Sequence, residues 1–91
     1  MRHNSQVPEI SRFLGIVIGM FYNEHGVAHF HAVYGGQKVS IEIESGEVHG
    51  RFPPRALQLV QEWASMHREE LQENWERARR GEPLERIEPL E

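Results

Sequence analysis

The chain has 91 residues, a net charge of −4 and no cysteine. This length predicts a single domain over residues 1–91 and excludes separate binding and catalytic domains. The lack of cysteine excludes disulfides and thiolate metal sites, and it is compatible with a cytoplasmic protein. Nucleic-acid binding stays open but is not favoured, because an acidic protein gains little from contacts with phosphates.

The first half of the chain predicts strands. Residues 1–8 are polar and lack the apolar core of a secretory signal, so we expect a flexible N-terminal segment there. Residues 9–50 are expected to form a sheet, whose first strand is the β-branched and aromatic segment 15–22. That segment is too short to cross a bilayer, and no membrane association is expected. Residues 29–34 and 37–44 alternate in polarity and complete a three-stranded antiparallel sheet.

The turn Gly35-Gly36 predicts the register of the second and third strands. If Tyr34 faces Gln37 across this turn, alternate residues of both strands fall on two distinct faces. The apolar face carries Phe30, Ala32, Tyr34, Val39, Ile41 and Ile43. The other face carries His29, His31, Lys38, Ser40, Glu42 and Glu44. We therefore expect Phe30 in the core and its two flanking histidines outside it.

Residues 53–80 are predicted to be helical. Apolar side chains recur at steps of three and four from Leu57 to Ala78, which is typical of a helix with one buried face. Pro53-Pro54 suits the first turn, and Gly81 marks the end.

The predicted helix is longer than the sheet that it covers. Either its end projects, or the chain bends near Ser65, which could then cap a second helix. No glycine or proline forces a bend there, and we expect a continuous or mildly bent helix. Residues 83–91 are expected to pack as an extended tail. The predicted fold is therefore α+β, with a small three-stranded antiparallel sheet covered on one face by a long C-terminal helix.

Several separated motifs resemble a small bacterial family, domain of unknown function 4160. They are Pro8–Phe13, Gly15–Ile18, His25 with His29-Phe30-His31, Tyr34-Gly35, Ser45–Val48, Pro54–Leu57, Glu62-Trp63, His67-Arg68, Glu70-Leu71, Asn74-Trp75 and Ile87–Leu90. The family has no established activity. Its members are often encoded beside a second small domain, and such pairs have been suspected of being toxin–antitoxin modules. The resemblance implies a bacterial, cytoplasmic setting and a small partner protein encoded nearby.

Three of the six histidines lie within residues 25–31, which makes this segment the candidate site. Alternate residues of a strand point to one side, so His29 and His31 can converge on one divalent metal such as zinc. His25, Glu24 or Glu42 could supply the third ligand. The alternative is that these histidines form a plain solvated surface.

The same face also offers a metal-free acid–base site. Its candidate catalytic residues are His29, His31, Glu42 and Lys38, because a carboxylate can orient an imidazole and raise its pKa. Lys38 or Arg12 could hold an anion, which would suit phosphodiester cleavage.

A third interpretation is recognition through an apolar and imidazole-bearing surface. The residues of this interaction face would be Phe21, His29, His31, Lys38 and Ser40. The leading prediction is a small interaction protein, one half of a toxin–antitoxin-like pair. The alternative is a metal-binding or metal-dependent hydrolytic, nuclease-like domain that uses His25, His29 and His31. Self-association into a homo-oligomer also stays open.

Overall fold

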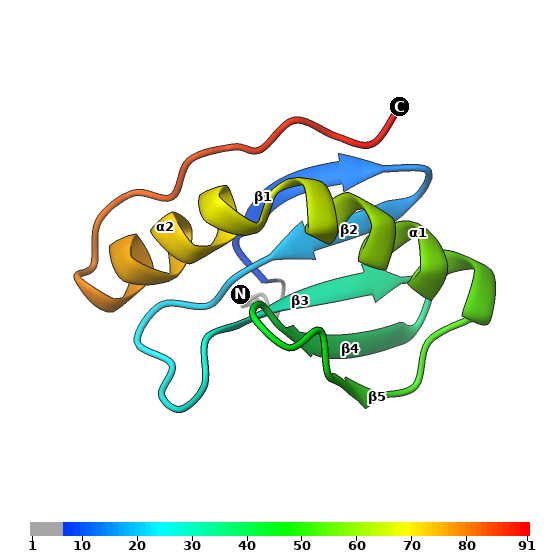
Figure 1. Ribbon diagram of the computed structural model, residues 1–91, viewed down its shortest axis with the longest axis horizontal. Coiled ribbons are helices and arrows are strands. Elements are labelled where there is room, and N and C mark those ends of the chain that lie inside the picture. The colour runs from blue at the N-terminus through cyan, green and yellow to red at the C-terminus, as the bar shows by residue number, and fades with distance from the viewer. Residues whose placement is uncertain (1–6) are drawn as a thin grey trace, which may run out of the picture.

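The computed structural model describes residues 7–91 and shows an antiparallel sheet covered on one face by two helices (Figure 1). The sheet has five strands in the order β1-β2-β3-β4-β5. The elements are β1 (Glu9–Phe13), β2 (Ile16–Gly19), β3 (His29–Tyr34), β4 (Gln37–Glu42), β5 (Val48–Gly50), α1 (Pro54–Met66) and α2 (Arg68–Arg79). The predicted α+β class is confirmed. Helices with the length and apolar character needed to span a bilayer are not found within residues 7–91.

The prediction of three strands is wrong, because a short strand is added at each edge. β1 pairs with β2 through a tight turn in which Leu14 and Gly15 both have positive φ, 52° and 81°. Leucine rarely adopts this conformation, so Gly15 alone marks this turn in the sequence. β5 has only three residues and pairs with β4 after a turn at residues 43–46. A strand this short carries too little alternation to be recognised.

The predicted register of the central hairpin is confirmed. Tyr34 pairs with Gln37, and Phe30 pairs with Ile41. Phe30 is fully buried among the residues that face the helices, whereas His29 and His31 lie on the opposite side of β3. We call this opposite side the helix-free face; it carries His29, His31, Lys38, Ser40 and Glu42.

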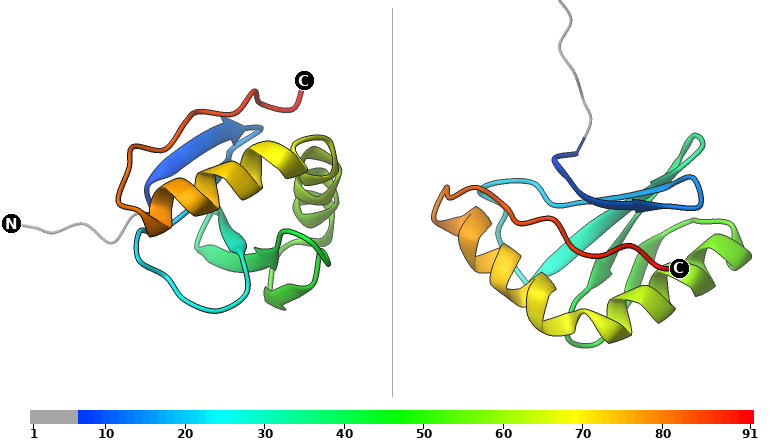
Figure 2. Two further views of the ribbon diagram at one scale, coloured as in Figure 1. Left: turned by 60° about the vertical axis from the view of Figure 1, so that its left-hand side comes forward. Right: turned by 90° about the horizontal axis from the view of Figure 1, so that it is seen from above.

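The prediction of one long helix is also wrong. The helical segment is interrupted at His67, whose backbone has the non-helical angles φ −127° and ψ 29°. The interruption follows Ser65 by two residues, and Ser65 does not cap α2, because its hydroxyl donates to the carbonyl of Glu62 at 2.7 Å. The two helices meet at a wide angle and stay over the sheet (Figure 2). One straight helix of the predicted length, about 40 Å at 1.5 Å per residue, would project from a molecule whose longest extent is 35 Å.

Trp63 of α1 lies at the centre of the core. Its ring centroid is 5.5 Å from that of Phe13 and 6.0 Å from that of Phe30, so it joins two strands to the helical layer. Apolar side chains from all of the longer elements surround it, including Ile10, Ile16, Ile18, Met20, Val39, Ile41, Val60, Leu71 and Ile87. Burial of this set supplies the main stabilisation of the domain, because apolar burial is the dominant favourable term in folding.

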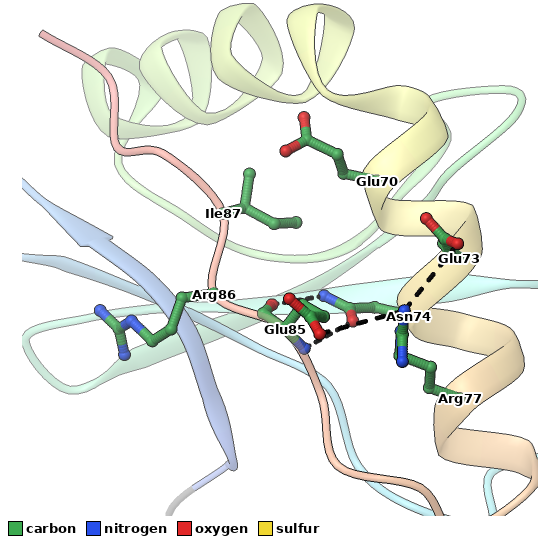
Figure 3. Close-up of a pocket in the computed structure, with 7 residues that line it drawn as sticks. All are labelled: Glu70, Glu73, Asn74, Arg77, Glu85, Arg86 and Ile87. Carbon is green, nitrogen blue, oxygen red and sulfur yellow. Dashed lines mark hydrogen bonds and ion pairs between the residues drawn. The ribbon is translucent and has the colours of Figure 1, made fainter.

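The tail packs in an extended form along β1 and α2 (Figures 1 and 2). Ile87 donates its N–H to the carbonyl of Ile10 at 2.8 Å, and the indole of Trp63 donates to the carbonyl of Glu88 at 2.8 Å. The Asn74 amide donates to the carbonyl of Glu85 at 2.8 Å and accepts from its N–H at 2.9 Å (Figure 3). The tail therefore covers the β1 edge of the sheet.

Candidate metal centre

The connection between β2 and β3, residues 20–28, places Glu24 over the helix-free face. Asn23 and Gly26 have positive φ, 62° and 90°, and reverse the chain within this loop. At the end of β2 the chain passes under the N-terminal segment. A Cβ on Gly19 would lie 2.5 Å from the Pro8 carbonyl oxygen and 2.6 Å from the Val7 methyl carbons. Glycine is therefore required where the loop starts, directly opposite His31 in the sheet.

Three potential ligand atoms converge at this point. His29 Nε2 lies 2.6 Å from Glu24 Oε1, and His31 Nε2 lies 3.1 Å from the same oxygen. All three atoms lie within 4.8 Å of one another. Ligands around zinc, with bonds of about 2.0–2.2 Å, lie about 3.4 Å apart in a tetrahedron. The side chains therefore need to separate by less than about 1 Å to admit an ion.

The ring of His29 is oriented by the backbone of the same loop. Its Nδ1 lies 2.8 Å from the carbonyl oxygen of Val27, which can only accept, so Nδ1 carries the proton of this bond. The other ring nitrogen, Nε2, then faces Glu24. Metal-bound histidines almost always have their second nitrogen held in this way.

Aromatic side chains enclose the centre. Phe21 contacts the His31 ring edge-on at 5.0 Å, and the rings of His29 and His31 lie 5.1 Å apart. α2 extends past the start of β3, where Trp75 contacts the His29 ring at 5.1 Å (Figure 1). The exposed fractions of the His31, His29 and Glu24 side chains are only 11%, 18% and 32%. The predicted plain solvated surface therefore does not describe this cluster.

The local electrostatics keep Glu24 charged and His31 neutral near neutral pH. Burial opposes ionisation of Glu24, but the hydrogen bond and charge of His31, together with those of His29, outweigh it and lower the pKa of Glu24. Burial lowers the pKa of His31 below its usual 6.5, and the hydrogen bond with Glu24 only partly offsets this effect. An ionised carboxylate and an uncharged imidazole are the forms of Glu24 and His31 that metal binding requires.

A second cluster of titratable side chains lies on the neighbouring strands. His49 Nε2 lies 3.0 Å from Glu42 Oε2, and Ser45 donates to Glu42 Oε1 at 2.8 Å. The hydrogen bond from His49, followed by that from Ser45, lowers the pKa of Glu42. Glu47, 3.9 Å from His49, completes the group. These side chains are more exposed than the first cluster, with His49 at 52%.

Comparison with known proteins assigns the chain to a family. Residues 15–76, which include both clusters, match the family described as Domain of unknown function (DUF4160). The chain belongs to this family. Comparison with curated proteins and with solved structures finds no significant match.

The structure separates the residues that the sequence grouped together. Of the candidate third ligands, Glu24 meets His29 and His31, whereas Glu42 pairs with His49 instead. His25 is exposed and lines an open hollow with His29.

The remaining predicted residues surround the centre. Lys38 lies over the Phe21 ring, 5.4 Å from its centroid, and Ser40 pairs with His31 in the sheet. Arg12 is bound to Glu9 at 2.8 Å on β1. His49 had received no role from the sequence, because its three-residue strand was not recognised. His67 contacts Trp63 and Glu70 between the helices.

Proposed function

We propose that this domain binds a divalent transition metal, zinc in the first instance, through Glu24 Oε1, His29 Nε2 and His31 Nε2. The observation that carries the proposal is the convergence of these atoms within 4.8 Å, with His29 already oriented by the Val27 carbonyl. Nitrogen and carboxylate ligands suit zinc and its neighbours, whereas calcium and magnesium prefer all-oxygen sites. Three protein ligands leave a coordination position for water or substrate.

Calorimetric titration of the full chain, stripped with a chelator, tests this proposal with zinc chloride. We expect one ion per chain and an affinity that falls at least about tenfold in Glu24→Gln and in His31→Ala, because each substitution removes a ligand. His67→Gln is the matched control, since His67 lies between the helices and its loss should leave zinc affinity unchanged. Circular dichroism checks that each variant is folded. Absence of binding, or equal affinity in all variants, would contradict the proposal.

A second candidate function is binding of a small partner protein. The loop that supplies Glu24 also presents Val27 and Tyr22 to solvent, with 61% and 39% of their surface exposed. Exposed apolar side chains that lie close together are typical of an interaction site. This role agrees with a toxin–antitoxin-like pair in the bacterial cytoplasm, as the family resemblance implies.

Co-expression with the small protein encoded beside the gene tests the second candidate. We expect the two chains to co-purify, and Val27→Asp to abolish this, because it places a charge in the interface. Met66→Asp is a matched control, since Met66 is similarly exposed, at 58%, but lies at the end of α1. Failure to co-purify, or equal loss in both variants, would argue against this interface.

A further inference from the structure

An open hollow of about 270 Å³ lies beside the proposed metal centre. Its lining residues are His25, Val27, His29, Ser40, Glu42 and His49. His29 belongs both to this lining and to the proposed metal ligands, so a group in the hollow would contact one of those ligands.

The register of the sheet places a second histidine across the hollow. His31 pairs with Ser40, and Ser40 pairs with His49, so these residues form one row across β3, β4 and β5. Neighbouring strands lie about 4.8 Å apart, and the backbones of His31 and His49 are therefore separated by about 10 Å. Ser40 lies between them as part of the floor. This spacing leaves room for one tetrahedral group between the metal and the His49 ring.

The ring of His49 is oriented by a carboxylate, as the ring of a catalytic acid–base histidine is. Glu42 accepts from its Nε2 at 3.0 Å, and Glu42 is itself held by the Ser45 hydroxyl at 2.8 Å. Ser45 in turn accepts from the N–H of Glu47 at 3.1 Å. A carboxylate that is fixed in this way orients the imidazole. The Nδ1 atom of His49 is then the one that is available to a bound molecule.

An anionic ligand in the hollow would meet the Glu42 carboxylate of its lining, so its attraction would have to come from the ion and from Lys38. Lys38 lies on the same face, two residues before Ser40 on β4, and its charge acts on His31. Its amino group lies over the Phe21 ring, which contacts the His31 ring. A divalent ion and an ammonium group on one side of the hollow would together attract a phosphate ester.

On the basis of the proposed metal site, we propose that this hollow binds and hydrolyses a phosphate ester, with His49 as the general acid. An ion held by Glu24, His29 and His31 would activate a water molecule for attack; the oxygen of that water would form a bond to phosphorus, and its proton would go to solvent. The bond from phosphorus to the leaving oxygen breaks, and that oxygen takes the proton from His49. His49 then regains a proton from solvent, so the reaction consumes one water molecule. Lys38 and an ion held by Glu24, His29 and His31 would stabilise the charge on the phosphoryl oxygens.

Two phosphodiesters with different leaving groups test this role with the zinc-loaded full chain. Thymidylyl-thymidine releases an alkoxide that needs a proton, whereas bis(p-nitrophenyl) phosphate releases a nitrophenolate that leaves without one. General acids contribute about 10²–10⁴-fold, so His49→Gln should slow cleavage of the dinucleotide about 100-fold or more. The same substitution should slow cleavage of the nitrophenyl ester much less. His67→Gln should leave both rates unchanged.

Each contrary outcome has a distinct meaning. Absence of zinc binding would overturn the metal site and this inference together. Zinc binding without hydrolysis of either ester would overturn the inference alone. Equal effects of His49→Gln on both esters would show that His49 is not the acid. Two ions per chain, one of them lost in His49→Gln, would make His49 a metal ligand and overturn its acid role.

Discussion

Asn74→Ala is expected to destabilise the domain strongly, because it detaches the C-terminal tail from α2. Its side chain is 1% exposed, and both of its polar atoms bind the backbone of Glu85 in the tail (Figure 3). The substitution removes both hydrogen bonds and leaves the Glu85 N–H and carbonyl without these partners. The same tail carries Ile87 and the carbonyl that accepts from Trp63, so its attachment affects the core.

The size of the effect follows from the two lost partners. A buried polar group without a partner costs about 1–3 kcal/mol. Water can reach part of this region, because Asn74 and Glu85 line a hollow of about 300 Å³, so we expect a total nearer 2–3 kcal/mol than the full sum. A domain of this size has a total stability of about 5–14 kcal/mol. At about 4–8 °C per kcal/mol, the melting temperature should fall by about 10–20 °C.

Urea unfolding followed by circular dichroism measures this change. Glu73→Ala is the matched control, because Glu73 precedes Asn74 and its side chain is 68% exposed. The control should stay within about 0.5 kcal/mol of the unmodified protein. If Asn74→Ala also stays within that range, the hydrogen bonds to Glu85 do not hold the tail, and the reasoning fails.

Three further predictions concern the loop, the tail and acid stability. Gly19→Ala should cost about 1–3 kcal/mol in urea unfolding, because the new Cβ would meet Val7 and the Pro8 backbone. Gly36→Ala, where a Cβ meets open space, should be close to neutral. Ile87→Ala should lower the free energy of unfolding by about 2–4 kcal/mol, because the Ile87 side chain is 3% exposed and belongs to the core. A loss under about 1 kcal/mol would show that Ile87 does not belong to the core. The metal-free protein should lose stability on acidification, first as the pH falls below 6.5 and again below 4.5, because His31 and Glu24 both have lowered pKa values in the fold. In each of these ranges the unfolded chain binds more protons than the folded one, so stability rises with pH. His31→Gln should remove the upper step in urea titrations at several pH values, and a curve unchanged by this substitution would refute the assignment.

The candidate site was only partly predictable. Strand periodicity placed His29 and His31 on one side of β3 and Phe30 on the other, because alternation is a local property of any strand. The same register placed Glu42 opposite His29, and the structure keeps that backbone pairing. The Glu42 side chain nevertheless turns to His49 and Ser45, since β5 brings a hydrogen-bond donor to its other side.

The third ligand illustrates the limit of such reasoning. Glu24 is seven residues from His31, in a loop whose path depends on the positive φ of Asn23 and Gly26 and on the packing of Val7 against Gly19. Only the folded structure defines the path of this loop. The sequence could name Glu24 as one of three candidates, but it could not choose among them.

The sequence by itself determined the central hairpin, the helical character of the second half and the family of the chain. These features rest on local periodicity, on the Gly35-Gly36 turn and on motifs along the chain, none of which needs distant contacts. The tertiary structure decided the two edge strands, the interruption at His67 and the side chains that each histidine contacts. Those outcomes depend on tertiary contacts. A three-residue strand and a loop carboxylate take their positions from neighbours that are distant in the sequence.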